Sequence, residues 1–267
     1  MTEGGALLLR LIGAQIRAQM QYKVSFLTDF LATFLGMLLE FAGVAVLFLH
    51  IPTLGGWTLP QVAFLYGTAE VSLATARLFT NGFDAFPETI RLGSFDRVLI
   101  RPRSAFLQML AADFSLRQAG RVLQGVWVLG FALWWLGEPW GVERWLFLGW
   151  TLLGGTAFFS GLFVVGGTLA FWTVESLEAI NILTYGGATM ASYPMNIYAT
   201  WMRNFFLFVV PLAFVNFYPA LVLLGKSDPF SLPPFVPYLA FPACLLVFLA
   251  SVLFWRFGVK HYQSTGH

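Results

Sequence analysis

Residues Trp145–Trp172 read WLFLGWTLLGGTAFFSGLFVVGGTLAFW and contain no charged side chain. A helix needs about 20 apolar residues to cross the hydrocarbon core of a bilayer, so this stretch is long enough to span a membrane. Six further segments approach that length and composition: Val24–Leu49, Leu59–Thr80, Phe106–Leu136, Ala179–Trp201, Asn204–Leu224 and Phe235–Phe257. These runs are too long for the strands of a membrane barrel and lack their alternation.

The composition of the whole chain agrees with a lipid environment. Hydrophobic residues make up 58% of the 267 residues and charged residues only 10%, and the mean hydropathy is +0.74. Soluble domains carry about 25% charged residues, so lipid must cover most of this surface. The net charge of +2 gives no reason to expect nucleic-acid binding. We therefore expect an all-α polytopic membrane protein in which residues 1–267 form one transmembrane domain.

Lys and Arg predict the orientation, because cytoplasmic loops carry an excess of both. Most of them fall in residues 1–23, in the loop 81–104, and around the end of the last segment with its tail 258–267. The connections on the other side carry only Arg144 and Lys226. Both termini are thus expected in the cytoplasm, which requires an even number of crossings.

One of the seven segments therefore cannot cross. We favour 204–224 as a re-entrant segment, because Pro211 and Pro219 each remove a backbone donor and allow the chain to bend. The alternative is 179–201, which contains Pro194 and would leave Arg203 in the cytoplasm. The preferred topology has six spans, at 24–49, 59–80, 106–136, 145–172, 179–201 and 235–257.

The N-terminal residues predict an amphipathic helix. Apolar side chains recur every four positions, at Leu8, Ile12, Ile16 and Met20. Arg10 and Arg17 fall on another face, so residues 1–23 are expected to lie in the cytoplasmic interface. A plain extension of the first span is the alternative.

The loop 81–104 contains a short helix with start and stop signals. Pro87 suits a first helical position, Glu88 suits the first turn, and Gly93 suits a C-terminal cap. We expect this loop to expose large apolar side chains among charges, at Phe86, Ile90, Leu92, Phe95 and Leu99. Apolar anchors ringed by charge suit docking onto another protein. The alternative is that the loop packs on its own helix ends.

Two carboxylates lie deep within predicted spans, at Glu40 and Glu70. Each costs a few kcal/mol at the bilayer centre unless it is paired, protonated or hydrated. They could pair with Arg77 or Arg203, line a polar pathway, or relay protons. Pairing would make them structural, whereas the other two roles would make them part of a transport route.

A second group of charges lies where the third span begins. Asp113, Arg117 and Arg121 are spaced by four residues, so Asp113 and Arg117 are expected to pair along one helix face. Such a pair would bridge charges at the membrane edge or close a cytoplasmic gate.

The sequence shows no pattern of a catalytic or metal site. It lacks HExxH, Gly-x-Ser-x-Gly and the usual Cys/His spacings, and its one cysteine, Cys244, lies in an apolar run. A relaxed phosphate-loop pattern ends at Lys226-Ser227, but its intervening residues belong to an apolar helix. We therefore expect no enzymatic activity, no bound metal and no cofactor in this chain.

Several stretches together resemble one transporter family. They are IRLGSFDRVLIRP at 90–102, FWTVE at 171–175, and the region from Tyr193-Pro194 through Arg203 and Pro211 to Tyr218-Pro219-Ala220. The chain resembles, over nearly its full length, the ABC-2-type permease subunits of ATP-binding-cassette exporters, in a bacterial branch of unassigned substrate.

The resemblance implies six spans, an N-terminal interfacial helix, a coupling helix between spans two and three, and a re-entrant element before the last span. It also implies a dimer with an identical or related permease, on two copies of a separate ATPase subunit that holds ATP and Mg, in the bacterial plasma (inner) membrane. The residues that would dock onto the ATPase are Phe86, Pro87, Ile90, Arg91, Gly93, Phe95, Asp96, Arg97, Leu99, Arg101 and Pro102. An ion- or proton-coupled transporter or channel using Glu40 and Glu70 stays open as an alternative, and the sequence does not indicate the substrate.

Overall fold

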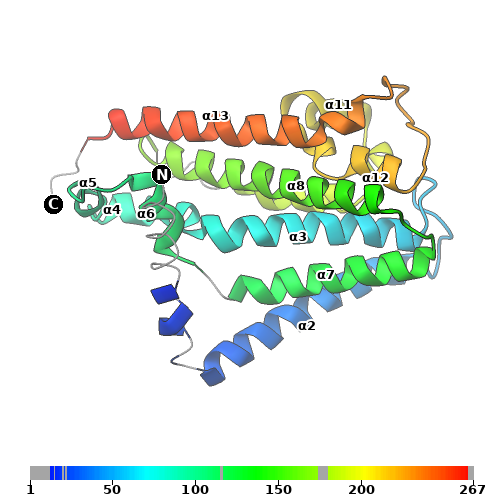
Figure 1. The fold of residues 1–267 in the computed structure, drawn as a ribbon, viewed down its shortest axis with the longest axis horizontal. Helices are drawn as coiled ribbons and strands as arrows, with labels where there is room; N and C mark the ends of the chain where they lie inside the picture. Colours follow the sequence, from blue (N-terminus) through cyan, green and yellow to red (C-terminus); the bar gives the residue numbers. More distant parts are fainter. Residues whose placement is uncertain are drawn as a thin grey trace.

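The computed structural model describes residues 13–263, except residues 15, 20, 22, 115–116 and 174–179. Most of these residues are helical. Among the described residues, the only β-type pairing is one isolated bridge between Leu54 and Trp57. The predicted all-α class is confirmed. Figure 1 shows the long helices side by side along the long axis of the molecule.

Within the described residues five helices are long: α2 (Lys23–Leu47), α3 (Leu59–Asp84), α7 (Arg117–Leu136), α8 (Val142–Leu169) and α13 (Ala240–Lys260). Short helices connect α3 to α7, namely α4 (Phe86–Arg91), α5 (Asp96–Leu99) and α6 (Ala105–Ala112). The region after α8 is a series of short pieces: η2 (Ile182–Gly186), α10 (Gly187–Ala191), η3 (Met195–Ile197), α11 (Thr200–Asn204), η4 (Phe205–Val209), η5 (Leu212–Phe214), α12 (Phe217–Leu223) and η6 (Val236–Leu239).

Among the described residues, four helices are long and apolar enough to cross a membrane: Lys23–Leu47, Gln118–Leu136, Val142–Leu169 and Val236–Lys260. A bent pair, Thr200–Val209 with Leu212–Leu223, would add a fifth if it were one span. Exposed leucines form a stripe along α2, as expected of a surface that faces lipid: Leu27, Leu31, Leu35 and Leu39. The chain is a multi-pass membrane protein.

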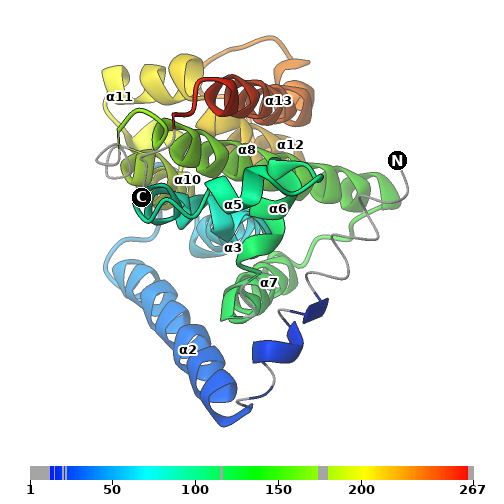
Figure 2. The ribbon, with the colours of Figure 1, turned by 90° about the vertical axis from the view of Figure 1, so that its left-hand side faces the viewer.

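Helix α3 forms the centre of the bundle. It packs most extensively on α7 and α8, while α13 covers α8 and α2 lies mainly on α7 (Figures 1 and 2). Because its neighbours cover it, α3 carries polar residues that a lipid-facing helix would not tolerate. The hydroxyl groups of Thr68 and Thr80 donate hydrogen bonds to carbonyls one turn earlier in the same helix, which satisfies them away from water.

Small residues allow these helices to approach closely. A Cβ atom on Gly67 of α3 would lie 2.8 Å from the backbone nitrogen of Leu129 on α7. A Cβ atom on Gly161 of α8 would lie 3.1 Å from the Cα of Phe248 on α13. Both crossings depend on the missing side chain, as is common between helices in membranes.

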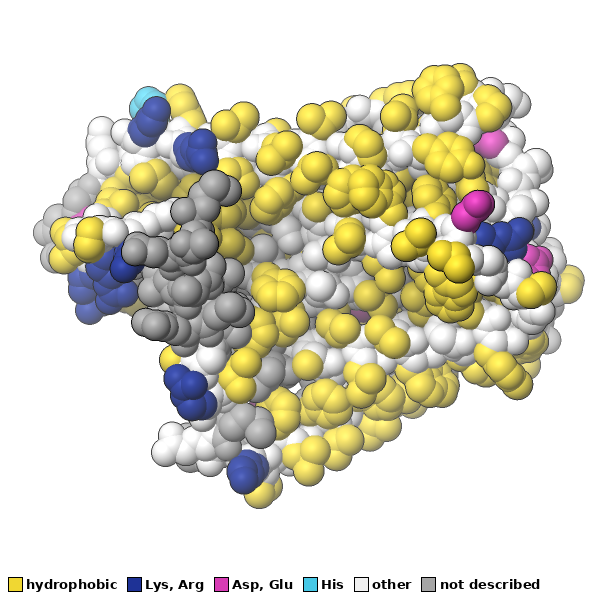
Figure 3. Space-filling view, in the orientation of Figure 1, with side chains coloured by type: hydrophobic (Ala, Val, Ile, Leu, Met, Phe, Trp, Pro, Cys, Tyr) yellow, Lys and Arg dark blue, Asp and Glu magenta, His cyan; other side chains and the backbone are white. Residues whose placement is uncertain are grey.

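The two ends of the bundle differ in charge. Lys and Arg side chains gather at the end that holds α4, α5, α6 and the last described residues, as Figures 1 and 3 show. We call this end the basic end. The connections between α2 and α3 and between α7 and α8 lie at the opposite end (Figure 1).

The segment predicted as one span at 106–136 is broken in the structure. Helix α6 ends at Ala112 and α7 begins at Arg117, and the backbone of Asp113 is not helical (φ −140°, ψ 73°). The Asp113 carboxylate accepts a hydrogen bond from Nδ2 of Asn81 on α3. The predicted run of Asp113 and Arg117 along one helix face is therefore wrong, because Asp113 lies outside the helix and bonds to α3.

The pieces after α8 first run from the basic end to the opposite end. The hydroxyl group of Tyr185 donates to Asp84 at the basic end of α3, at 3.2 Å. Within η3, Nδ2 of Asn196 donates to the Gly55 carbonyl at the opposite end, at 2.7 Å.

The next pieces begin and finish at the opposite end. Thr200–Val209 and Leu212–Leu223 meet at an angle of 73°. In the second arm, directly before α12, Nδ2 of Asn216 donates to the carbonyls of Leu65 and Ala191 at 2.9 and 2.8 Å. The chain then returns to the loop that Asn196 contacts, where Nζ of Lys226 donates to the Gly56 carbonyl at 3.1 Å. Most of the predicted N-terminal interfacial helix, by contrast, lies outside the described residues.

Candidate transport pathway and coupling surface

The loop at the basic end rests on a cluster of buried aromatic rings. Phe86 and Phe95 are both 0% exposed, and their ring centroids lie 4.9 Å apart at a steep angle. Phe86 also packs on Trp255 of α13 at 4.9 Å, and Phe95 packs on Tyr262 at 5.1 Å. Edge-to-face contacts of this kind add to the free energy gained by burying the rings. The cluster fixes the loop to the end of α13.

The prediction that Phe86, Ile90 and Phe95 are exposed is wrong. Pro87 and Ile90 are buried beside the two rings, so these apolar residues contact their own chain. The reason is that Phe171 and Trp255, far away in the sequence, provide an aromatic surface that the loop covers. In this conformation, the side chains of Phe86, Pro87, Ile90 and Phe95 therefore cannot contact a partner directly.

The capping signals of α4 are confirmed. Pro87 lies in the first turn, and Gly93 adopts the left-handed conformation with φ of 62°. The amide of Gly93 donates to the Ile90 carbonyl and that of Ser94 to the Thr89 carbonyl, at 2.9 and 3.1 Å. These two bonds form a Schellman motif, which ends the helix sharply and reverses the chain.

The outer surface of the loop carries the remaining predicted residues. Leu92 is 64% exposed and Ile100 is 81% exposed, and charged and polar side chains surround them. The exposed residues of this surface are Glu88, Arg91, Leu92, Arg97, Leu99, Ile100, Arg101, Pro102 and Arg103. We call this set the coupling surface. Asp96 and Gly93 are partly buried at its edge.

One ion pair organises the helical part of the coupling surface. Nε and a terminal nitrogen of Arg91 donate to the two carboxylate oxygens of Glu88, at 2.8 and 2.7 Å. These hydrogen bonds hold the pKa of Glu88 below its usual value and raise that of Arg91. The pair therefore stays charged throughout the neutral range.

Polar residues continue from the loop into the bundle along one face of α3. Arg77 forms a salt bridge with Asp84 at 3.7 Å and lies over the ring of Tyr185, 5.1 Å from its centroid. Glu70 and Tyr66 follow on the same face, two and three turns further from the basic end. Of the alternatives left open for Glu40 and Glu70, the pairing with Arg77 is not seen, since Arg77 forms its salt bridge with Asp84.

Arg203 does not join this polar face. It lies over the ring of Phe230 at 4.5 Å, in the region between α11 and the following loop. Arg121 lies on α7 and is partly buried, whereas nothing is described for the side chain of Arg117. The four predicted intramembrane residues thus separate into the pair Glu40 and Glu70, a salt-bridged Arg77 and a distant Arg203.

Glu40 and Glu70 line one cavity, of about 320 Å³, between α2, α3 and α10. We call it the central cavity. The other residues that line it are Gly43, Val44, Leu47, Tyr66, Thr189, Ser192 and Tyr193. Tyr66 donates to the Met37 carbonyl at 3.4 Å, and Nε2 of Gln124 contacts the same carbonyl at 3.5 Å. These bonds connect the α2 backbone to α3 and α7 at the edge of the cavity.

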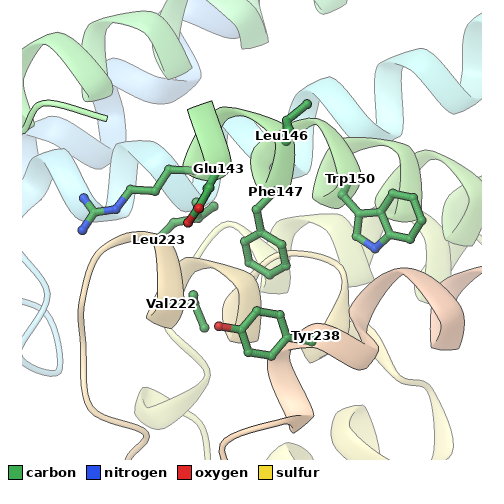
Figure 4. Close-up of a pocket in the computed structure, with 8 residues that line it drawn as sticks. Glu143, Leu146, Phe147, Trp150, Val222, Leu223 and Tyr238 are labelled. Atoms are coloured by element: carbon green, nitrogen blue, oxygen red, sulfur yellow. The ribbon is translucent and has the colours of Figure 1, made fainter. Parts of the chain in front are cut away.

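A larger cavity of about 640 Å³ lies at the opposite end, between α8, α12 and η6. Figure 4 shows the rings of Phe147 and Tyr238 next to each other in it, with the Glu143 side chain directed toward Leu223. Arg144 also lines this cavity but forms a salt bridge with Glu138 at 2.9 Å. We call this the outer cavity. Its walls are mainly aromatic and aliphatic, which suits the apolar part of a lipid.

The comparisons with known proteins now give the family. A family model described as ABC-2 family transporter protein matches residues 34–266. The chain belongs to the ABC-2 transporter family. No curated protein and no solved structure matches this ABC-2 protein. The family consists of membrane transport components rather than catalytic ones, so membership confirms the resemblance and does not favour an ion-coupled transporter.

Sequence reasoning missed two sets of residues in this ABC-2 protein. Tyr66 of the central cavity was not singled out, although Tyr66, Glu70, Arg77 and Asp84 have the spacing of one helix face. Tyr193 entered only as part of the family resemblance. Trp255 and Tyr262, which hold the loop, gave no local signal, and Phe171 entered only through the family resemblance. Their contacts with Phe86 and Phe95 join distant parts of the chain.

Proposed function

We propose that this chain is the permease subunit of an ATP-binding-cassette exporter in a bacterial plasma membrane. It would form the substrate pathway together with a second permease, identical or related. Two copies of a separate ATPase subunit, which hold ATP and Mg, would drive it. Family membership supports the class of protein, and the coupling surface at the basic end carries the proposal for the ATPase contact.

The distribution of charge supports the orientation. Lys and Arg prefer the cytoplasmic side of a membrane, so the basic end would face the cytoplasm, with both termini there. The coupling surface would then lie where ATP and the ATPase subunits are found. Six crossings would result, with residues 179–201 as the fifth and 204–224 as the re-entrant element. Bonds from Asn196 and Lys226 to neighbouring residues of one loop support that assignment.

The structure refines the predicted ATPase contact. We propose that the exposed residues of the coupling surface touch the ATPase, while Phe86, Pro87, Ile90 and Phe95 transmit its movement. Because the buried rings pack against Trp255, a displacement of α4 would be passed to α13. ATP-driven closure of the two ATPases could thereby favour one permease conformation over another, through contacts that differ between the two states.

Co-purification tests this proposal. A tagged protein would be isolated in mild detergent from its own host, and bound subunits would be identified by mass spectrometry together with ATPase activity. We expect an ATP-binding-cassette subunit with the native chain and a loss of at least tenfold with Ile100→Asp. The matched control is Val142→Asp, because Val142 is 75% exposed but lies at the opposite end. Retention of the ATPase by Ile100→Asp, or its absence from the native protein even after crosslinking, would contradict the proposal.

A further inference from the structure

The central cavity contains a carboxylate that the fold does not satisfy. Glu70 is 7% exposed, and its Oε2 atom has no hydrogen-bond partner in the described part of the chain. A buried polar group without a partner costs free energy, and a buried carboxylate costs more. A molecule that enters the cavity would supply the missing partner.

The charge of the cavity points to the kind of partner. Glu40 of α2 lines the same space as Glu70 of α3, and neither forms a salt bridge with any described residue. Arg77, which lies two turns away on α3, already pairs with Asp84. Two carboxylates at one cavity favour a bound positive charge, and the attraction to Glu70 is the stronger because Glu70 is buried away from water.

The walls of the cavity are not those of a site for a small inorganic ion. Tyr66 and Tyr193 line the space, and Val44 and Leu47 add aliphatic surface. Aromatic faces attract organic cations, and carboxylates fix their charge. The volume of about 320 Å³ is within the range of sites for small organic ligands.

The outer cavity does not meet these conditions. Its basic residue Arg144 is already paired with Glu138, and its walls are mainly apolar. No polar side-chain atom that lines it is both buried and without a partner among the described residues. Glu143 nevertheless provides a carboxylate in a separate pocket of the same chain, which makes it a suitable control.

We propose that the central cavity binds an organic cation with an aromatic or apolar body, whose charge lies against Glu70 and Glu40. Naming this cation as exported cargo rests on the proposed function, whereas the binding itself does not. Tyr66 and Tyr193 would contact the body of the ligand, and Val44 and Leu47 would exclude water from it.

Ethidium, an aromatic cation, is a direct probe of this site. Its fluorescence anisotropy would be titrated with the purified full chain in detergent, without any ATPase subunit. We expect saturable binding that weakens at least tenfold in Glu70→Gln, which corresponds to about 1.4 kcal/mol. Glu143→Gln should bind like the native chain. Phenanthridine, the uncharged parent ring system, should compete at least tenfold more weakly than unlabelled ethidium.

A second variant keeps the test decisive if Glu70→Gln does not fold. Glu40 lies on the exposed side of α2, so Glu40→Gln should leave folding intact and still weaken ethidium binding several-fold. The proposal is overturned if ethidium shows no saturable binding, if the folded Glu70 and Glu40 variants bind like the native chain, or if Glu143→Gln is the variant that weakens binding. Equal competition by phenanthridine would likewise refute a site for a cation.

The two proposals fail separately. If ethidium binds as expected but no ATPase subunit co-purifies, the cavity stands and the exporter assignment fails. If the ATPase subunit co-purifies and Ile100→Asp releases it, but the Glu70 and Glu40 variants bind ethidium like the native chain, the exporter assignment stands and the organic-cation site fails.

Discussion

Replacing Phe86 by alanine should detach the coupling loop from the bundle. The ring is 0% exposed and packs on Phe95, Phe171 and Trp255 with centroid distances of 4.9, 5.1 and 4.9 Å. Burying a phenylalanine removes on the order of 200 Å² from water, which at about 25 cal/mol per Å² is about 5 kcal/mol. Phe-to-Ala replacements in packed cores cost about 3–5 kcal/mol, and we expect a loss in that range for Phe86→Ala.

The single cysteine provides the assay. Cys244 on α13 is 0% exposed, so a thiol-reactive dye reaches it only when the bundle opens. The temperature at which labelling begins would be compared between the native chain, Phe86→Ala and Leu92→Ala. Leu92 is 64% exposed in the same loop, so its replacement should change the stability by no more than about 0.5 kcal/mol. Equal labelling profiles for the two variants would refute the packing argument.

Four further predictions follow from particular contacts. Gly67→Val should prevent the protein from eluting as a single size-exclusion peak in detergent, because the new Cβ would lie 2.8 Å from the Leu129 backbone. Gly36→Val, whose Cβ would lie in open space, should elute as a single peak. Asn216→Leu should lower the free energy of unfolding by about 1–3 kcal/mol in the thiol assay, since the carbonyls of Leu65 and Ala191 lose a donor; an unchanged profile would argue against the buried bend. Arg144→Gln should change the free energy of unfolding by less than about 1 kcal/mol, because the salt bridge of Arg144 with Glu138 is exposed. A larger loss in the thiol assay would contradict an exposed position for this pair. The pKa of Glu88 lies below its usual value of about 4.3. The stabilisation that its ion pair with Arg91 provides is therefore complete above that value, and it is lost only as the pH falls through the lowered pKa. The amount of ATPase that co-purifies should thus be equal at about pH 6 and 8. A smaller amount at one of these pH values would contradict a pair that stays charged in this range.

The long helices could be predicted from the sequence because length and apolar composition set whether a helix can span a bilayer. Residues 145–172 were expected as a span, and α8 runs from Val142 to Leu169. The break between α6 and α7 could not be predicted, since it depends on Asn81 of another helix holding Asp113. The short pieces after α8 were equally hidden, because prolines mark where a chain can bend but not at which angle.

The candidate site was predictable only in part. Glu40 and Glu70 stood out because carboxylates are costly within spans, and the structure places them at one cavity. The other residues that line this cavity could not be deduced, since Tyr193 and Ser192 come from a distant segment. In the loop, the same apolar residues suited either a partner or the chain's own helix ends. Phe86 and Phe95 contact their own chain because Trp255 and Phe171 lie beneath them.

Crosslinking from the two ends of the molecule tests the central claim most directly. Single-cysteine variants Ile100→Cys, in the coupling surface, and Ser231→Cys, in the loop before η6, would be treated with a bifunctional maleimide in native membranes. Cys244 is buried and should contribute little background. The account predicts that an ATP-binding-cassette subunit is crosslinked to Cys at position 100 and not at position 231. Crosslinking of that subunit from position 231 alone, or from neither position, would contradict it.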